Sequence, residues 1–403
     1  MAIGLDPHRP ARLALCGNVF PAEDLRAARE VLDRRVPELD AAWRRAGGAG
    51  EAPGFGLYLA AQAVAELEAD AELRAAFLAA WRQSAWPVWT ANAFPFGGFH
   101  GDRVKEQAFL PDWRTPERLQ YTLGVARLLS ELLPEGTEGS LSTCPLGYGP
   151  DARVDPRSAA QLHALGAELD ALFEDSGVSL TLAIEPEPDG AMERVETLAA
   201  WLRAEVGHAR IGICWDLCHA AVVGESADQV LAALQREEVA LGKVQVSAAL
   251  RSEAGFGAAA RALTEELARD RYFHQARWSA GEQQASWPDL PPLIAEENWI
   301  ERLGLADGSG ELRVHCHVPL DLGAPVPGWA PTDWQSMLRA AYAAGCRDFE
   351  VETYTLPVLP ESLLSAQPRA AAQAQAASLV DIMAAELRAT AAEIGLDTVA
   401  ADL

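Results

Sequence analysis

The feature that most constrains how this 403-residue chain can fold is a regular alternation of two kinds of segment. Short runs rich in strand-forming residues are separated by longer Ala/Leu/Glu/Arg segments with the apolar period of a helix. We predict strands at residues 13–20, 55–59, 87–94, 139–145, 180–186, 210–216, 242–247, 312–319 and 348–354. We predict helices at residues 22–45, 116–133, 157–175, 195–206, 226–237 and 332–344.

Such an alternation implies parallel strands joined by right-handed crossovers. Nine strands are close to eight plus one, so we predict an α/β fold of the (β/α)8 TIM-barrel type. An open doubly wound sheet is the alternative, but no GxGxxG motif follows the first strand. Residues 251–312 are too many for one crossover, so we expect an excursion between barrel strands 7 and 8, closed by RVHCHVP. We expect one domain over residues 1–403, with an Ala-rich helical tail at 367–403 outside the barrel.

Composition argues against several classes of function. The formal net charge is -25, and such an acidic surface repels phosphate backbones, so nucleic acid is not expected as a partner. We find no signal-peptide pattern and no apolar run near the roughly 18 residues of a membrane span, so we expect a cytoplasmic protein without membrane insertion. The six cysteines form no CxxC pair, as is typical of buried thiols in a reducing compartment. Cys214 and Cys218 flank Asp216, but their spacing is poor for zinc.

Polar side chains stand at or near the ends of the later predicted strands, where barrels of this type carry their chemistry. Because side chains alternate along a strand, two residues that are two positions apart share one face. The candidates are Glu185, Asp216 with His219, Gln245 followed by Arg251, His315 with His317, and Glu350 with Glu352.

Carboxylates that converge on one barrel mouth would repel one another in a partly dry site. A divalent cation removes this repulsion, and oxygen ligands beside an imidazole or amide suit Mn²⁺, Mg²⁺ or Zn²⁺. We therefore predict that Asp216 faces a metal ion shared with Glu185 and Glu352. Each residue alone also fits a structural role: a solvated loop acid, a helix cap or a core histidine. The combination favours the site, because each residue falls at a comparable point of its own strand unit.

The segment NAFPFGGFH would form the opposite rim of the mouth, near the end of the third strand. It offers Asn92 and His100 as candidate substrate-binding residues, and the glycines at 97–98 indicate a loop able to approach a ligand closely. Its phenylalanines fit either a pocket wall or a hydrophobic loop fixed to the barrel. Lys105 and Tyr148 are further polar candidates.

At these positions the chain resembles the xylose isomerase-like TIM-barrel superfamily. This superfamily includes sugar isomerases, ketose 3-epimerases and phosphoesterases of the endonuclease IV type. Its pattern is Glu, Asp-x-x-His, His and Glu on four C-terminal strands. Glu185, Asp216 with His219, and Glu352 match this pattern, which implies three carboxylate metal ligands. Gln245 stands where the third ligand is usually His, and an amide oxygen is a weaker ligand than imidazole.

The resemblance implies roles for residues outside this pattern too. Arg251 matches the substrate-contacting Arg of the epimerases by its distance from the third ligand. His315-x-His317 is similar to the Asp-x-His that adds metal ligands in the endonuclease IV group. If these two histidines bind a cation, the site holds a second metal.

More specifically, the chain resembles the EboE family of metabolite traffic proteins. The family is named for a gene cluster concerned with exporting or trafficking secondary-metabolite precursors. The resemblance therefore implies a role in such a pathway, with other proteins of the cluster as partners, but no particular reaction. The segments that carry it are WTANAFPFGGFHGDRVKEQAFLPDW, GSLSTCPLGYGP, AIEPEPDG, CWDLCHAAV, KVQVSAAL, RVHCHVPL and FEVETYTLPVLP.

We rank first a metal-dependent isomerase or epimerase that acts on a small hydroxy-ketone or hydroxy-aldehyde. Glu185 and Glu352 would move the proton as base and acid, while His219 and Arg251 hold substrate oxygens. The second hypothesis is a non-catalytic metabolite-binding protein, which a metal site weakened by Gln245 favours. The third is a multi-metal phosphoesterase acting on a small metabolite, which the two histidines of RVHCHVP favour.

Overall fold

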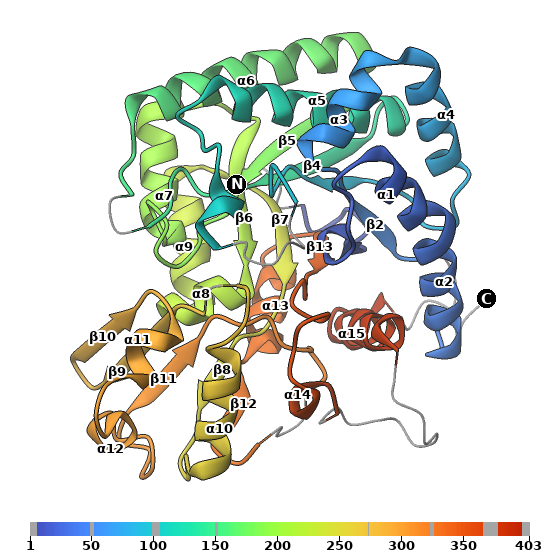
Figure 1. Cartoon of the computed structure of the whole chain (residues 1–403). Helices are drawn as coiled ribbons and strands as arrows, with labels where there is room; N and C mark the ends of the chain where they lie inside the picture. Colours follow the sequence, from blue (N-terminus) through green and yellow to red (C-terminus); the bar gives the residue numbers. More distant parts are fainter. Residues whose placement is uncertain are drawn as a thin grey trace.

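The computed structural model of the protein describes residues 6–48, 52–98, 105–149, 152–272, 274–322, 326–365 and 378–396. Eight parallel strands form a closed barrel in the order β1-β13-β7-β6-β5-β4-β3-β2, which confirms the predicted (β/α)8 fold (Figure 1). The barrel strands are β1 Arg12–Cys16, β2 Gly54–Tyr58, β3 Thr90–Asn92, β4 Glu138–Thr143, β5 Ser179–Ile184, β6 Ile211–Asp216, β7 Ala240–Val246 and β13 Asp348–Val351.

Helices connect the barrel strands, and their ends follow ordinary capping rules. Ser226 begins α9 with a capping box completed by Gln229, and Asp333 caps α13, so both predicted starts lie within two residues of the real ones. The helices are η1 Gly17–Val19, α1 Leu25–Glu30, η2 Val31–Arg35, α2 Val36–Arg45, α3 Ala61–Ala69, α4 Ala71–Arg82, η3 Lys105–Phe109, α5 Pro116–Leu132, α6 Pro156–Ser176, α7 Val195–Trp201, η4 Leu202–Val206, α8 Leu217–Val223, α9 Ala227–Glu237 and α13 Trp334–Ala343.

The predicted excursion lies between β7 and β13, and it forms a second sheet of five antiparallel strands in the order β10-β9-β11-β8-β12. In Figure 1 most of this sheet lies at the lower left, beside the barrel. The eight-residue strand predicted at 312–319 is wrong in extent, because β11 ends at Val314 and the histidines follow it. The excursion contains β8 Leu250–Ser252, α10 Ala258–Leu267, β9 Ala276–Ala280, β10 Gln283–Trp287, α11 Leu290–Ile294, α12 Trp299–Arg302, β11 Glu311–Val314 and β12 Trp329–Pro331.

The barrel interior contains a buried ion pair. Lys243 Nζ lies 2.5 Å from Glu350 Oε2, and both side chains are fully buried. Asn92 bonds both partners, donating to Glu350 at 3.0 Å and accepting from Lys243 at 3.1 Å. Gly56 on β2 leaves the space that the Glu350 carboxylate fills, since a Cβ atom there would overlap it. This network fixes Glu350 in β13, two positions before Glu352, which directly follows the strand.

The described part of the predicted C-terminal tail contains helix α15 Leu379–Glu393, which packs against α2, where Asp381 pairs with Arg45 at 2.6 Å. Helix α14 Glu361–Ser365 lies before the tail. Glu386 of α15 is fully buried and accepts hydrogen bonds from Thr353 Oγ1 at 2.6 Å and the Leu320 amide at 3.1 Å. Helix α15 thereby links the segment after β13, which contains Thr353, to the segment after His317, which contains Leu320.

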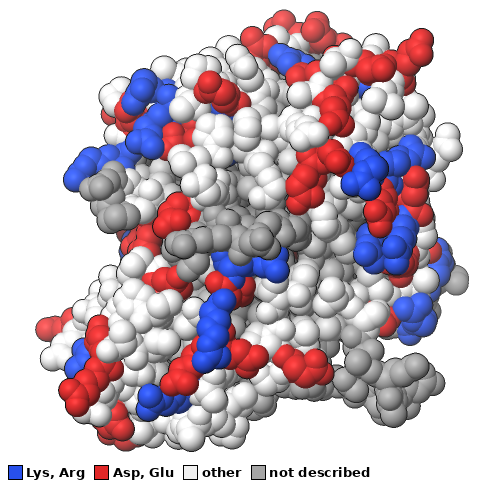
Figure 2. Space-filling model, viewed as in Figure 1, with Lys and Arg blue, Asp and Glu red and all other residues white. Residues whose placement is uncertain are grey.

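Charged side chains are mixed on the face shown in Figure 2, where Lys and Arg lie next to Asp and Glu. Ion pairs such as Arg29–Asp33 at 2.7 Å and Arg44–Asp40 at 2.8 Å join side chains of opposite charge within single helical segments. Among the described residues, no helix combines the length and apolar character that crossing a membrane requires.

Candidate metal centre

Three carboxylates meet where the barrel strands end. Glu185 directly follows β5, Asp216 ends β6, and Glu352 directly follows β13. One oxygen of each lies within 4.8 Å of one oxygen of each of the others. Their exposed fractions are only 6 %, 2 % and 5 %. We call these three residues the carboxylate triad; the structure brings them together as the strand-end argument expected.

The triad contains buried oxygen atoms that lack a protein partner. Asp216 Oδ1 accepts from the His219 amide at 2.8 Å and from Ser247 Oγ at 2.9 Å, so Asp216 also caps α8. Glu352 Oε1 accepts from Asn18 Nδ2 at 2.6 Å. Asp216 Oδ2 and Glu352 Oε2 are buried without a hydrogen-bond partner among the described residues. Because an unpaired buried carboxylate oxygen is costly, the donor set fits a divalent cation.

The electrostatics of the triad also favour a bound cation. Burial, then the charge of Glu352, raises the pKa of Glu185 well above its usual value. Burial, then the charge of Asp216, raises the pKa of Glu352 to about 8. Without a cation Glu352 therefore holds its proton for much of the time at neutral pH, and a bound cation would favour the ionised form.

A group of three imidazole rings lies beside the triad. His219 of α8 and His315 and His317, which follow β11, are all buried. His219 Nε2 lies 3.1 Å from His315 Nε2 and 3.4 Å from His317 Nε2. Asp216 belongs to both clusters, because one of its oxygens lies within 4.8 Å of ring nitrogens of His219 and His317. We call these three histidines the imidazole group.

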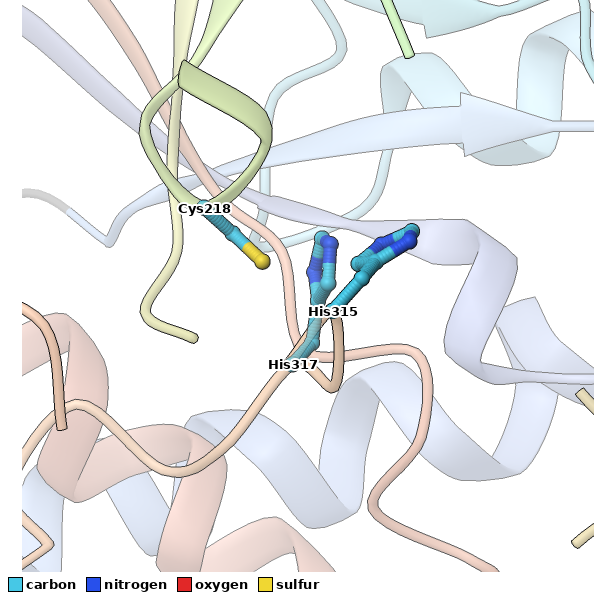
Figure 3. A group of neighbouring side chains, drawn as sticks. All are labelled: Cys218, His315 and His317. Atoms are coloured by element: carbon cyan, nitrogen blue, oxygen red, sulfur yellow. The ribbon is translucent and has the colours of Figure 1, made fainter. Parts of the chain in front are cut away.

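Sequence reasoning missed the metal-ligating potential of Glu187, and it considered Cys218 only together with Cys214, whose spacing is poor for zinc. Glu187 lies within ligand distance of His219 and His315, and burial, then Asp216, raises its pKa well above the usual value. The sulfur of Cys218 points toward the rings of His315 and His317 (Figure 3). Each stands two residues after a triad member, and that spacing was the available signal.

Two other predicted residues, Gln245 and Arg251, make contacts outside the triad. Gln245 is buried beside Asp216 in the sheet register, and its Oε1 accepts from Cys214 Sγ at 2.9 Å. Arg251 lies on β8, pairs with Glu253 at 2.9 Å and lines a surface pocket with residues of α9 and α13. The described residues that line this pocket include no member of the triad or the imidazole group.

The candidates from the predicted opposite rim lie in different places. Asn92 belongs to the buried Lys243–Glu350 network, while His100 lies outside the described residues. The Tyr148 ring stacks on Phe109 with centroids 3.9 Å apart. Lys105 begins η3.

Gln275, which sequence reasoning also missed, links this rim to the imidazole group. Its Nε2 donates to the Tyr148 hydroxyl at 2.7 Å, and its Oε1 accepts from His315 Nδ1 at 2.7 Å.

The chain belongs to the xylose isomerase-like TIM barrel family, whose model matches residues 49–379. A search of curated proteins found no match. Solved structures share the fold at low sequence identity. A protein of Anabaena variabilis, for which a sugar phosphate isomerase/epimerase activity has been suggested, is 16 % identical with a TM-score of 0.51, over 96 % of this chain and 99 % of that one.

Two further solved structures are similar to this chain. A xylose isomerase-like TIM barrel protein of Mycobacterium smegmatis in complex with magnesium is 10 % identical with a TM-score of 0.51, over 97 % of this chain and 99 % of that one. A D-allulose 3-epimerase of Methylomonas sp. is 13 % identical with a TM-score of 0.48, over 98 % and 100 %.

Proposed function

We propose that the chain is a metal-dependent isomerase or epimerase that acts on a small, sugar-like hydroxy-carbonyl compound. The observation that carries this proposal is the carboxylate triad, with two buried, unpartnered oxygens at the end of the barrel where such folds carry their chemistry. Family membership supports it, as do the activity suggested for the Anabaena variabilis protein and the magnesium in the mycobacterial one.

Glu185, Asp216 and Glu352 would hold the cation, and their oxygen atoms suit Mg²⁺ or Mn²⁺ best, with Zn²⁺ as a further possibility. When bound, the cation would polarise the substrate carbonyl as a Lewis acid. Asn18 and Ser247 would orient Glu352 and Asp216 through the hydrogen bonds described above.

Proton transfer would belong to the two glutamates. Glu185 follows β5 and Glu352 follows β13, and β6 and β7 separate these strands in the barrel. The two carboxylates therefore flank Asp216 from opposite sides. One would remove the proton next to the substrate carbonyl, and the other would return a proton to the product. Because both residues are buried, bulk water would be kept away from the proton while it is transferred.

The resemblance to EboE proteins supports the further proposal that this reaction belongs to the handling of secondary-metabolite precursors, with proteins of the same cluster as partners. A second candidate function is a multi-metal phosphoesterase for a small metabolite. The imidazole group favours it, because displacement at phosphorus benefits from more than one metal. A third is metabolite binding without turnover, which Gln245 at the expected His position favours.

The test is exchange of the substrate's α-carbon hydrogen with deuterium oxide, followed by NMR over a panel of ketoses and hydroxy-aldehydes. We expect Mn²⁺-loaded protein to exchange at least one of them, and Glu185→Gln and Glu352→Gln to be slower by about 100-fold or more. Glu266→Gln, an exposed residue of α10, serves as the matched control. Equal exchange by metal-depleted protein or by E185Q would contradict the proposal. Release of phosphate from sugar phosphates without exchange would favour the phosphoesterase, and copurification of an unchanged metabolite would favour a carrier.

A further inference from the structure

The loop between β5 and α7, residues 185–194, carries two acidic side chains of the candidate site. Glu185 belongs to the carboxylate triad, and Glu187 lies within ligand distance of two rings of the imidazole group. Further along this loop, Asp189 has a φ angle of 65°, in the left-handed region that residues other than glycine rarely adopt. Such a conformation persists only where neighbouring groups hold it. Whatever holds Asp189 therefore also helps to position Glu185, earlier in the same loop.

Two side chains of the excursion reach this loop from β9. Gln275, which directly precedes β9, donates from Nε2 to the Pro188 carbonyl at 3.1 Å. Arg277 Nη2 donates to Asp189 Oδ1 at 2.6 Å and to Glu193 Oε2 at 2.8 Å. Glu193 Oε2 also accepts from the Asp189 amide at 3.0 Å. One guanidinium group thus holds both the left-handed residue and its hydrogen-bond partner.

The ion pairs of Arg277 are partly shielded from solvent. The exposed fraction of the Arg277 side chain is 17 %, and those of its partners are 23 % for Asp189 and 34 % for Glu193. The arginine belongs to the excursion and the two acids belong to the barrel, so these pairs join segments that are distant along the chain. Because partly buried charge pairs are screened less than exposed ones, they contribute more to holding a loop in place.

Arg277 belongs to a row of three arginines that crosses the second sheet. Arg313 of β11 stands opposite Arg277 of β9 on one side and opposite Arg251 of β8 on the other, so the three side chains share one face. Arg313 Nη1 donates to the Ala221 carbonyl of α8, the helix that directly follows β6, at 2.7 Å. Arg251 instead pairs with Glu253, which directly follows β8 in the excursion. Two of the three arginines thus hold segments that follow triad strands, and Arg251 offers a matched control.

We propose that Arg277 is a positioning residue that holds the loop between β5 and α7, so that Glu185 keeps the geometry that proton transfer requires. The inference rests on the proposed function, because Arg277 acts through Glu185. The arginine does not touch the substrate, since its Nη2 is bonded to two loop carboxylates and its Nη1 to the Ala276 carbonyl. Displacing a reacting group by about 1 Å can slow a reaction about 100-fold, so a loosened loop costs rate even in a folded chain.

The first test measures catalysis by the full chain at saturating Mn²⁺, with the substrate hydrogen-exchange assay described above. We expect Arg277→Gln to lower kcat by about 10–100-fold while KM changes by less than about threefold, because a reacting group is displaced and the substrate contacts remain. Arg277→Lys should recover most of the lost rate, since one ammonium group can donate to both carboxylates. Arg251→Gln, in the same row of the same sheet, should retain the wild-type kcat.

The second test measures the loop itself and needs no activity. Amide hydrogen exchange of residues 185–194, followed by mass spectrometry, should become about 10-fold faster or more in R277Q and stay unchanged in R251Q, with the amides of α5 as the internal reference. Asp189→Asn weakens the same ion pair from the other side and keeps a residue that tolerates the left-handed region. It should also speed exchange in the loop, and adding D189N to R277Q should have little further effect.

The outcomes separate this role from the proposed enzyme. If the loop amides exchange as slowly in R277Q as in the wild type, the positioning role is wrong whatever reaction the chain performs. A faster-exchanging loop with an unchanged kcat would overturn it too. If the wild type exchanges no substrate hydrogen while R277Q and D189N both loosen the loop, Arg277 holds the loop as inferred and the proposed isomerase is wrong. If R277Q does not fold, R277K and D189N decide by the same two measurements.

Discussion

The Nδ1 atom of His317 lies 2.8 Å from the backbone carbonyl oxygen of Glu352. A side chain from the excursion is thereby fixed to the last strand of the barrel, at the residue that supplies one carboxylate of the triad. The imidazole group and the carboxylate triad thus share a structural frame.

Replacing Asp216 with Asn should have opposite effects on metal-free and metal-loaded protein. The Asn oxygen can still accept from His219 and Ser247, so the start of α8 is kept. Without metal, loss of a buried charge beside Glu185 and Glu352 should raise the free energy of unfolding by about 1 kcal/mol or more. Mn²⁺ affinity should fall by about 100-fold or more. Thermal unfolding with and without Mn²⁺ measures the stability and the metal affinity. Asp228→Asn, at an exposed position, serves as the control. A metal-free D216N protein that is less stable than the metal-free wild type would contradict the proposed triad.

Asn18 should act as a positioning residue for Glu352. Its Nδ2 donates to Glu352 Oε1 at 2.6 Å, and Asn18→Ala removes that donor. We expect metal affinity to fall by about 10–100-fold, as is typical when a partner of a ligand is lost. Calorimetric titration with Mn²⁺ measures the change, and the exposed Gln283→Ala provides the control. Unchanged affinity would show that Glu352 does not need this partner.

The stability of metal-free protein should fall as the pH rises from about 5 to 8. The pKa of Glu352 rises from 4.5 in the unfolded chain to about 8 in the fold, so the folded state binds the proton more tightly. That stabilisation is complete below pH 4.5 and is lost as the pH rises through 8, with a slope approaching 1.4 kcal/mol per unit for one proton. Urea unfolding at several pH values measures the slope. Glu352→Gln should reduce it, and a slope that E352Q leaves unchanged would contradict the assignment.

Glu386 should anchor α15 mainly through hydrogen bonds. Burial raises its pKa to about 8, so the side chain is mostly protonated at pH 7. Glu386→Gln retains an acceptor for Thr353 and Leu320 and should change stability little. Glu386→Ala leaves those donors unpaired and should cost about 2–4 kcal/mol. Chemical unfolding measures the free energy of unfolding of both variants. Equal losses of stability in E386Q and E386A would show that the negative charge, and not the hydrogen bonds, anchors the helix.

The barrel and its triad could be read from the sequence because both depend on local patterns. Glu185, Asp216 and Glu352 each follow a buried run, and closure of parallel strands brings strand ends together whatever the loops do. The position of Arg251 could not be read in this way. The chain leaves the barrel after β7 and enters an antiparallel sheet, so distance along the chain from Gln245 no longer measures distance in space.

The strands inside the excursion were not predicted, for a related reason. Strands such as β9, ARWSA, and β10, QQASW, are largely half-exposed or exposed and carry little apolar alternation. Their pairing is set by neighbouring strands rather than by their own sequence. The contacts of Gln275 with His315 and of Glu187 with the imidazole group arise only once this sheet has formed.

The most direct test of the central claim is a crystal structure of the full chain grown with Mn²⁺, with diffraction measured at the manganese absorption edge. We predict an anomalous peak between the oxygens of Glu185, Asp216 and Glu352, within bonding distance of Asp216 Oδ2 and Glu352 Oε2. The contradicting result is an empty triad at saturating Mn²⁺, with hydrogen bonds between the carboxyl groups in place of the ion.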